Sequence, residues 1–189
     1  MMKQTLVTLA CALITHIAWA QLEKGTQLAG ANISFNSHNT SSSDTARIIN
    51  SSAVNLNLRY GRFVAQQVAI GISCPLTYSG VGQQSDLRWG GGPFLRYYSP
   101  FEESKLTLLL EARASYNQGT FRDRAINYTQ TSRFLGGGVG MGVIYFFNES
   151  VGLETLFDYN YLTSLNSSRT ESGLALNIGL QIYLNKYGF

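Results

Sequence analysis

The 189-residue sequence predicts an all-β fold: an eight-stranded antiparallel up-and-down transmembrane β-barrel with long extracellular loops and short periplasmic turns. Three observations favour it. Apolar and polar residues alternate along eight segments, the connections between the segments alternate between long and short, and aromatic residues gather near the segment ends. Alternation with a period of two is typical of strands that have one apolar and one polar face.

The composition excludes two other classes of protein. The chain has 11 Tyr, 10 Phe and a formal net charge of only +3, whereas a disordered chain is poor in aromatic residues and rich in net charge. After the first twenty residues, no apolar run approaches the length of about 20 residues that a membrane-spanning helix needs. The positive charges are also dispersed, so we expect no nucleic-acid partner.

Residues 1–20 are predicted to be a secretory signal peptide, and residues 21–189 to form the barrel domain. Lys3 precedes an apolar stretch, and Ala18 and Ala20 are the small residues that a signal peptidase recognises. A membrane anchor would need a longer apolar stretch with charged flanks. The remaining chain keeps one cysteine, Cys74, so an internal disulfide framework is excluded.

Eight segments alternate in polarity and are the predicted strands. In order, they cover residues 29–35, 54–61, 68–77, 87–99, 107–116, 133–147, 151–160 and 174–184. Residues 54–61 are the most regular, and residues 87–99 and 133–147 are less regular because glycines occupy much of the polar face. Long polar connections are predicted at residues 37–52, 79–86, 118–132 and 163–171, and tight turns near residues 64–66, 100–104 and 148–150. Outer-membrane barrels have long loops at one end and short turns at the other.

Aromatic residues on the apolar face sort by depth. If the first strand runs outward, the aromatic residues at the outer ends are Phe35, Tyr78, Trp89, Tyr116, Tyr159 and Tyr161, and those at the inner ends are Tyr60, Tyr97 and Tyr145. Between them the face is mostly aliphatic, which is the pattern of two aromatic girdles around a lipid-facing band. A β-sandwich core has no reason to sort aromatic residues in this way. A soluble secreted barrel stays an alternative, because each strand pattern is a weak signal by itself.

The pattern resembles the small eight-stranded outer-membrane β-barrels of Gram-negative bacteria, the OmpA/OmpX-like porin-family proteins. The resemblance covers residues 21–189 and includes residues 92–98 before a tight turn, the glycine-rich strand at 136–142 and the final Phe189. It implies a monomer in the bacterial outer membrane, in contact with outer-membrane lipids including lipopolysaccharide and, during biogenesis, with the barrel-assembly machinery. One departure is that Tyr187 and Phe189 are odd-numbered whereas the apolar face of 174–184 is even, which requires a bulge near residues 185–188 or an atypical assembly signal.

The polar face predicts a plugged lumen. Its charged residues are Arg59, Arg88, Arg96, Glu111, Arg113, Glu154 and Asp158. An eight-stranded barrel is only wide enough for side chains to fill it, and enclosed charges of opposite sign pair with one another. Inward glycines leave room for these long side chains. A structural or surface-interaction role in the envelope is therefore favoured, and a small porin or transporter for ions or small solutes is the alternative.

The sequence predicts no catalytic residues, cofactor or metal site. The glycines at 136–142 lack the Lys-Ser/Thr of a phosphate loop, and the chain beyond residue 20 has a single histidine far from its cysteine. That histidine, His38, lies near Ser37 and Asp44 and leaves a lipid- or peptide-cleaving rim site as a lesser alternative. A basic and aromatic loop is the predicted surface contact for lipopolysaccharide; its residues are Phe121, Arg122, Arg124 and Tyr128, with Arg133 nearby.

Overall fold

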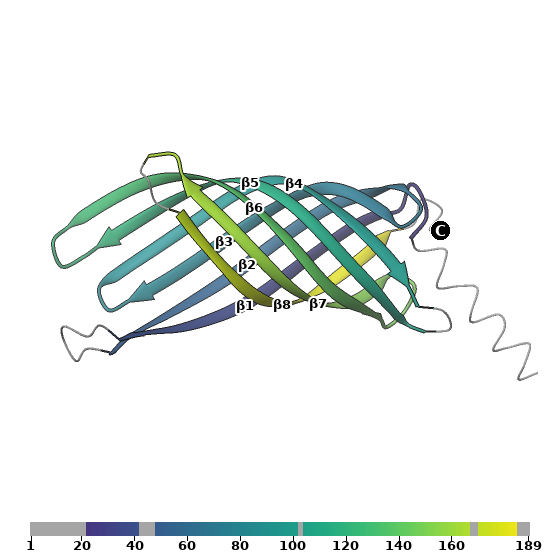
Figure 1. Ribbon diagram of the computed structural model, residues 1–189, viewed down its shortest axis with the longest axis horizontal. Helices are drawn as coiled ribbons and strands as arrows, with labels where there is room; N and C mark the ends of the chain where they lie inside the picture. The colour runs from purple at the N-terminus through teal and green to yellow at the C-terminus, as the bar shows by residue number, and fades with distance from the viewer. Residues whose placement is uncertain (1–21, 42–47, 102–103, 167–169, 185–189) are drawn as a thin grey trace, which may run out of the picture.

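The computed structural model describes residues 22–41, 48–101, 104–166 and 170–184, and these form a closed barrel of antiparallel strands (Figure 1). In chain order the strands are β1 (Gln27–Ser41), β2 (Ile48–Ala65), β3 (Val68–Val81), β4 (Gln84–Pro100), β5 (Leu106–Asp123), β6 (Tyr128–Phe146), β7 (Val151–Ser164) and β8 (Thr170–Leu184). Each strand pairs with its neighbours in sequence, and β1 pairs with β8. The predicted all-β fold of eight antiparallel up-and-down strands closed into a barrel is therefore confirmed. Within the described part of the chain, no helix is long and apolar enough to cross a membrane.

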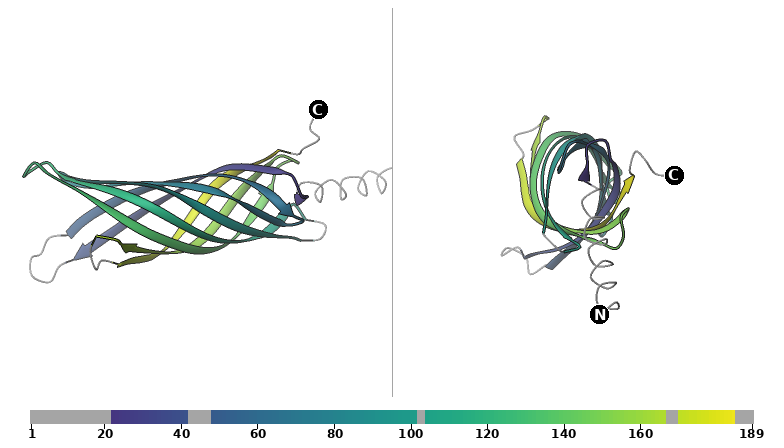
Figure 2. Two further views of the ribbon diagram at one scale, coloured as in Figure 1. Left: turned by 90° about the horizontal axis from the view of Figure 1, so that it is seen from above. Right: turned by 90° about the vertical axis from the view of Figure 1, so that its right-hand side faces the viewer.

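The barrel has an inner end and an outer end. The inner end carries Leu22, the start of β1 and the end of β8, and the outer end carries the hairpins that join β3 to β4 and β5 to β6 (Figure 1). The view along the barrel shows the strands as a ring (Figure 2). The predicted signal peptide at residues 1–20 and the register of residues 185–189 lie outside the described residues.

Side chains alternate across the wall of the barrel as the period of two requires. On β8, Leu174, Leu176, Ile178, Leu180, Ile182 and Leu184 point outward and are 45–62% exposed. The residues between them at the inner end, Asn177, Gln181 and Tyr183, are buried in the lumen. The outward face of β8 is thus aliphatic, and its inward face carries polar side chains at Asn177 and Gln181 and an aromatic one at Tyr183.

The strands continue further outward than the polarity pattern predicts. Residues 79–86 were expected to be a loop, but β3 and β4 are joined by Gly82 and Gln83 alone, with Gly82 at φ 59° in the left-handed region that glycine adopts readily. Likewise, residues 118–132 are mostly strand, and only residues 124–127 form the turn between β5 and β6. The prediction fails here because these extensions are mostly polar and their few apolar residues do not alternate, while backbone pairing continues.

Candidate functional site

The inner end of the lumen is closed by aromatic side chains. Phe63 lies 5.1 Å from Tyr98 between ring centroids, and Phe146 lies 5.3 Å from Tyr183. All four side chains are at least 92% buried, and Leu22 is buried with them. The chain before β1 also folds against this end, since the backbone N–H of Gln67 donates to the carbonyl oxygen of Leu22 at 3.0 Å. These contacts form a hydrophobic floor to the barrel.

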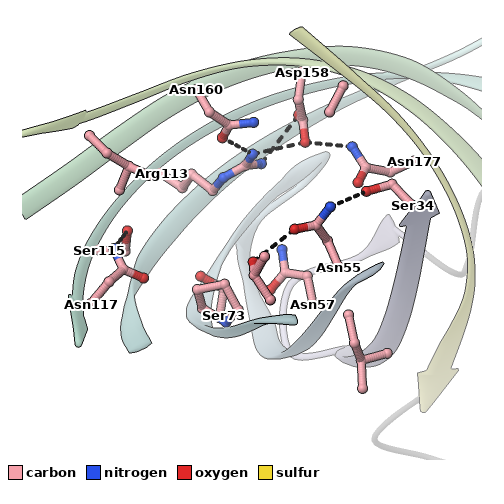
Figure 3. Close-up of a pocket in the computed structure, with 15 residues that line it drawn as sticks. Ser34, Asn55, Asn57, Ser73, Arg113, Ser115, Asn117, Asp158, Asn160 and Asn177 are labelled. Atoms are coloured by element: carbon pink, nitrogen blue, oxygen red, sulfur yellow. Dashed lines mark hydrogen bonds and ion pairs between the residues drawn. The ribbon is translucent and has the colours of Figure 1, made fainter. Parts of the chain in front are cut away.

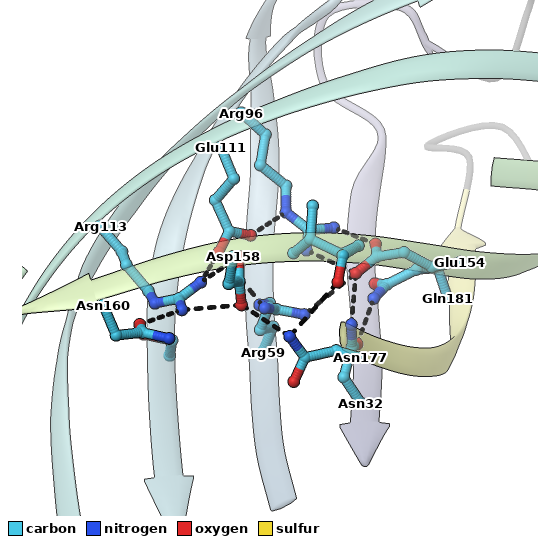
Figure 4. Close-up of polar contacts among 12 residues, drawn as sticks. Asn32, Arg59, Arg96, Glu111, Arg113, Glu154, Asp158, Asn160, Asn177 and Gln181 are labelled. Atoms are coloured by element: carbon cyan, nitrogen blue, oxygen red, sulfur yellow. Dashed lines mark hydrogen bonds and ion pairs between the residues drawn. The ribbon is translucent and has the colours of Figure 1, made fainter. Parts of the chain in front are cut away.

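Above this floor lies a cross-barrel network of buried charges, centred on Arg96 (Figure 4). The Arg96 side chain is fully buried; its Nε lies 2.6 Å from Glu111 and its Nη1 lies 2.8 Å from Glu154. Arg59 bridges the same two carboxylates, at 3.3 Å from Glu111 and 3.2 Å from Glu154. β2, β4, β5 and β7 are therefore joined through the lumen as well as through the wall. Enclosed charges need such complete pairing, because an unpaired ion in a medium of low dielectric constant costs several kcal/mol.

A second layer of the network lies further outward. Arg113 pairs with Glu111 and, at 2.8 Å, with Asp158, and it donates to Asn160. The side-chain amide of Asn177 also donates to Asp158 at 2.8 Å. The ion pairs of the two layers involve three arginines (Arg59, Arg96 and Arg113) and three carboxylates (Glu111, Glu154 and Asp158). The positive and negative formal charges in this group balance.

The structure brings together six of the seven charged residues predicted for the lumen and places Arg88 apart from them. Arg88 lies nearer the outer end, where it pairs across the barrel with Glu171 of β8 at 2.9 Å. It also pairs with Asp86 of its own strand at 3.5 Å. Its guanidinium lies 4.5 Å from the centroid of the Phe134 ring. Glu171 was expected in the loop at residues 163–171, so the sequence did not indicate it as a lumen partner for Arg88.

Two amide side chains that the sequence analysis did not single out complete the network. Asn32 donates to Glu154, and Gln181 donates to Asn32 at 3.1 Å, so β8 and β1 are also linked through the lumen. Both residues are at least 99% buried. The alternation places both residues on the inward face, but because their side chains are uncharged the sequence did not indicate that they belong to the charge network.

Glycine makes space for these side chains at Gly140. A Cβ atom at this position would collide with Oδ1 of Asp158, whereas a Cβ on the outward-facing Gly137 of the same strand would meet only the Arg113 carbonyl oxygen at 3.5 Å. We therefore expect Gly140→Val to displace the Asp158 carboxylate and to lower the free energy of unfolding by about 1–3 kcal/mol, as overpacking does. Gly137→Val should change it by less. Urea titration of both variants folded into vesicles checks this, and equal losses would contradict it.

A polar cavity of about 160 Å³ occupies the lumen between the charge network and Arg88. Most of its lining residues carry amide or hydroxyl side chains, among them Ser34, Asn55, Asn57, Asn117, Asn160 and Asn177 (Figure 3). Arg113 and Asp158 contribute to its wall and are already paired with each other. Oδ1 of Asn57 is buried and has no hydrogen-bond partner among the described residues.

The predicted girdle residues whose side chains are described all point outward and are exposed. Their exposed fractions are 42–55% at Tyr60, Tyr78, Trp89, Tyr97, Tyr116, Tyr145, Tyr159 and Tyr161. The side chain of Phe35 lies outside the described part. Phe101 and Phe147, which the sequence analysis did not include, are exposed at the inner turns.

The predicted surface-contact residues are spread over a hairpin and do not form a loop. Phe121 and Arg122 lie at the end of β5, Tyr128 begins β6, and Arg124 is in the turn between them. Phe121 is half-buried, and Arg122 is exposed on the outer face. Arg133 on β6 is exposed on that face as well.

The alternative of a rim-site enzyme rests on His38, whose side chain lies outside the described part. Among the described residues, no group of three or more His, Cys, Asp and Glu side chains is placed to hold a metal ion.

Comparison with known proteins adds evidence on the fold. No protein-family model matches the sequence, and no curated protein matches it. Among solved structures, Neisserial surface protein A (NspA) is similar with a TM-score of 0.58 and 17% identity, over 83% of this chain and 94% of that one. The N-terminal β-barrel domain of Pseudomonas aeruginosa OprF has a TM-score of 0.48 and 12% identity, over 82% and 97% of the two chains. The outer membrane protein OprG of Pseudomonas aeruginosa has a TM-score of 0.48 and 15% identity, over 87% and 99%. The likeness to NspA supports the eight-stranded barrel fold.

Proposed function

We propose that the chain is an integral protein of the bacterial outer membrane, with a plugged lumen and a non-enzymatic structural or surface-interaction role in the cell envelope. The outer surface supports the membrane location. Aliphatic side chains cover the middle of the strands, and aromatic side chains lie at two levels, as they do where a barrel meets the two interfaces of a bilayer. A water-soluble barrel would expose such a band to water at a large cost in free energy.

The observation that carries the plugged lumen is the pairing of Arg96 with both Glu111 and Glu154 across the barrel. A conducting path would have to pass through this fully buried group and then through the floor at Phe63 and Tyr98. Opening such a path would separate buried charges, which costs several kcal/mol. The balanced charges also offer no excess of one sign to select ions.

We expect the purified protein to give no stable single-channel conductance in planar bilayers and no swelling of liposomes in solutions of small sugars. A large porin reconstituted in the same way is the positive control. Reproducible conductance steps would overturn the plugged lumen and favour the alternative, a small porin or transporter.

We also propose that the outer face of β5 and β6 contacts lipopolysaccharide. Leu135 pairs with Tyr116 of the outer girdle, and Arg133 lies two residues further outward on the same strand. Arg133 is therefore at the level of the lipid head groups. Arg122 lies further out on the same face. Both arginines are exposed, and in the proposed outer-membrane location they face the anionic head groups of lipopolysaccharide.

The double variant Arg122→Ser/Arg133→Ser is expected to bind lipopolysaccharide more weakly, by about 1 kcal/mol for each arginine removed. Arg62→Ser is the matched control, since Arg62 is an exposed arginine near the inner end of β2. Binding to the protein in phosphatidylcholine nanodiscs can be followed by native mass spectrometry. Equal affinity of the double variant and the control would argue against this contact.

A further inference from the structure

The two strands that close the barrel are paired only in its inner half. Among the described residues, β1 and β8 pair from Gln27 with Leu184 to Ile33 with Ile178. Outward of that point, β8 continues to Thr170 with its other edge paired to β7, and Figure 1 shows β1 and β8 diverging toward the outer end. We call this unpaired stretch, bounded by Ser34 on one side and by residues 172–177 on the other, the seam.

The seam reaches below the outer aromatic girdle. Tyr159 and Tyr161 of that girdle pair with Leu174 and Ser172 of β8. Residues 174–177, whose edge toward β1 is unpaired, therefore lie on the bilayer side of the girdle. They amount to roughly 13 Å of strand at the usual rise per residue. Backbone N–H and C=O groups within hydrocarbon need partners, because each unsatisfied group costs several kcal/mol. Polar groups that can hydrogen-bond to the backbone of β8 must therefore reach this edge.

The polar cavity meets the seam directly. Ser34 from β1 and both Ala175 and Asn177 from β8 line it, and these residues lie on the two strands that part there. The side chains at this wall are small. Further outward, no described atom lies within 4 Å of the place where a Cβ on Gly173 would lie.

The cavity is narrowed in the other directions. The charge network and the aromatic floor close it toward the inner end. Toward the outer end, Arg88 and Glu171 pair across the barrel at 2.9 Å, and Phe134 lies against the guanidinium. Their partners in the register, Thr77 and Leu162, themselves line the cavity, so this ion pair stands at its outer limit.

We propose that the seam is a lateral portal, and that the cavity binds the head group of a single-chain amphipathic molecule from the outer leaflet. The head group is uncharged and rich in hydroxyl groups, and the alkyl chain leaves between β1 and β8 into lipid. The lining supports this class of ligand because the charges of Arg113 and Asp158 are already paired, while amide and hydroxyl groups remain. The inference rests on the proposed membrane location.

The probe is dodecyl β-glucoside, added to the isotope-labelled protein in phosphatidylcholine nanodiscs, with free glucose as the head group alone. The NMR signals of the side-chain amides of Asn57, Asn160 and Asn177 report on the cavity. We expect the glucoside to shift these signals with saturation, and glucose at the same concentration to leave them unchanged. Shifts of equal size with glucose would overturn the portal, and absence of shifts at saturating glucoside would overturn the site.

Two variants test the route. Ala175→Phe should obstruct the point where the seam meets the cavity and weaken glucoside binding about tenfold or more, which corresponds to about 1.4 kcal/mol. Gly173→Phe places a second obstruction where no described atom would collide with its Cβ, so the test does not depend on one variant alone. Ser79→Phe, an inward position of β3 away from the seam, is the matched control and should bind as the unmodified protein does. Unchanged binding by the correctly folded seam variants would exclude the portal.

The two proposals fail in different ways. Flotation with lipid and a heat-dependent shift in gel mobility establish that the protein is inserted and folded before the titration. Failure to insert would refute the membrane location, whereas insertion without a response to the glucoside would refute only the portal.

Discussion

Replacing Arg96 with alanine is expected to lower the free energy of unfolding by about 3–5 kcal/mol, the usual cost of removing one member of a buried ion pair. Arg96 is fully buried and is the partner of both Glu111 and Glu154 at less than 3 Å. Without Arg96, only the two positive charges of Arg59 and Arg113 balance the three negative charges of Glu111, Glu154 and Asp158. Urea titration in vesicles, followed by the fluorescence of Trp89, measures the loss.

Arg88→Ala is the matched control for this experiment. Arg88 also pairs with a carboxylate across the barrel, but its side chain is 16% exposed and that of Glu171 is 28% exposed. Water can therefore solvate the partner that remains, and a smaller loss than that of Arg96→Ala is expected. If Arg88→Ala and Arg96→Ala lowered the free energy of unfolding equally, burial would not determine how much each ion pair contributes to stability.

Met141→Arg is expected to lower the free energy of unfolding in a bilayer by about 2–4 kcal/mol, the cost of a cation on the lipid face near the midplane. Met141 points outward, is 57% exposed, and lies on β6 between Tyr145 at the inner girdle and Leu135 at the level of the outer one. Thr131→Arg on the same face of the same strand lies beyond the outer girdle and should be nearly neutral. If both variants were neutral, the aliphatic band would not face lipid.

The alternation of strand residues could be predicted because the period of two follows from strand geometry alone. Positions such as Leu174 and Gln181 are therefore assigned to the correct faces without knowledge of their neighbours. The ends of the strands could not be predicted in the same way. Residues 118–123 of β5 show no alternation of apolar and polar side chains, so the sequence there cannot be distinguished from a loop.

The partners within the lumen depend on the stagger of the strands, which the sequence of one strand does not contain. Arg88 and Arg96 occupy equivalent inward positions on β4, yet one meets Glu171 and the other meets Glu111 and Glu154. The aromatic floor was missed for a related reason. Tyr98 and Tyr183 lie on the inward face near the strand ends, where the alternation predicts polar residues.

The short pairing of β1 with β8 bears on how the molecule forms. Its seven registered positions join residues 27–33 to residues 178–184, which are separated by nearly the whole barrel sequence. The chain must bring these ends together before any of those backbone bonds forms, so closure is expected to come last and to be slow relative to the hairpins. Until then both terminal strands present free edges on which another chain could pair. Aggregation during refolding should therefore depend on protein concentration. Variants that weaken the pairing of residues 27–33 with β8 should increase this aggregation.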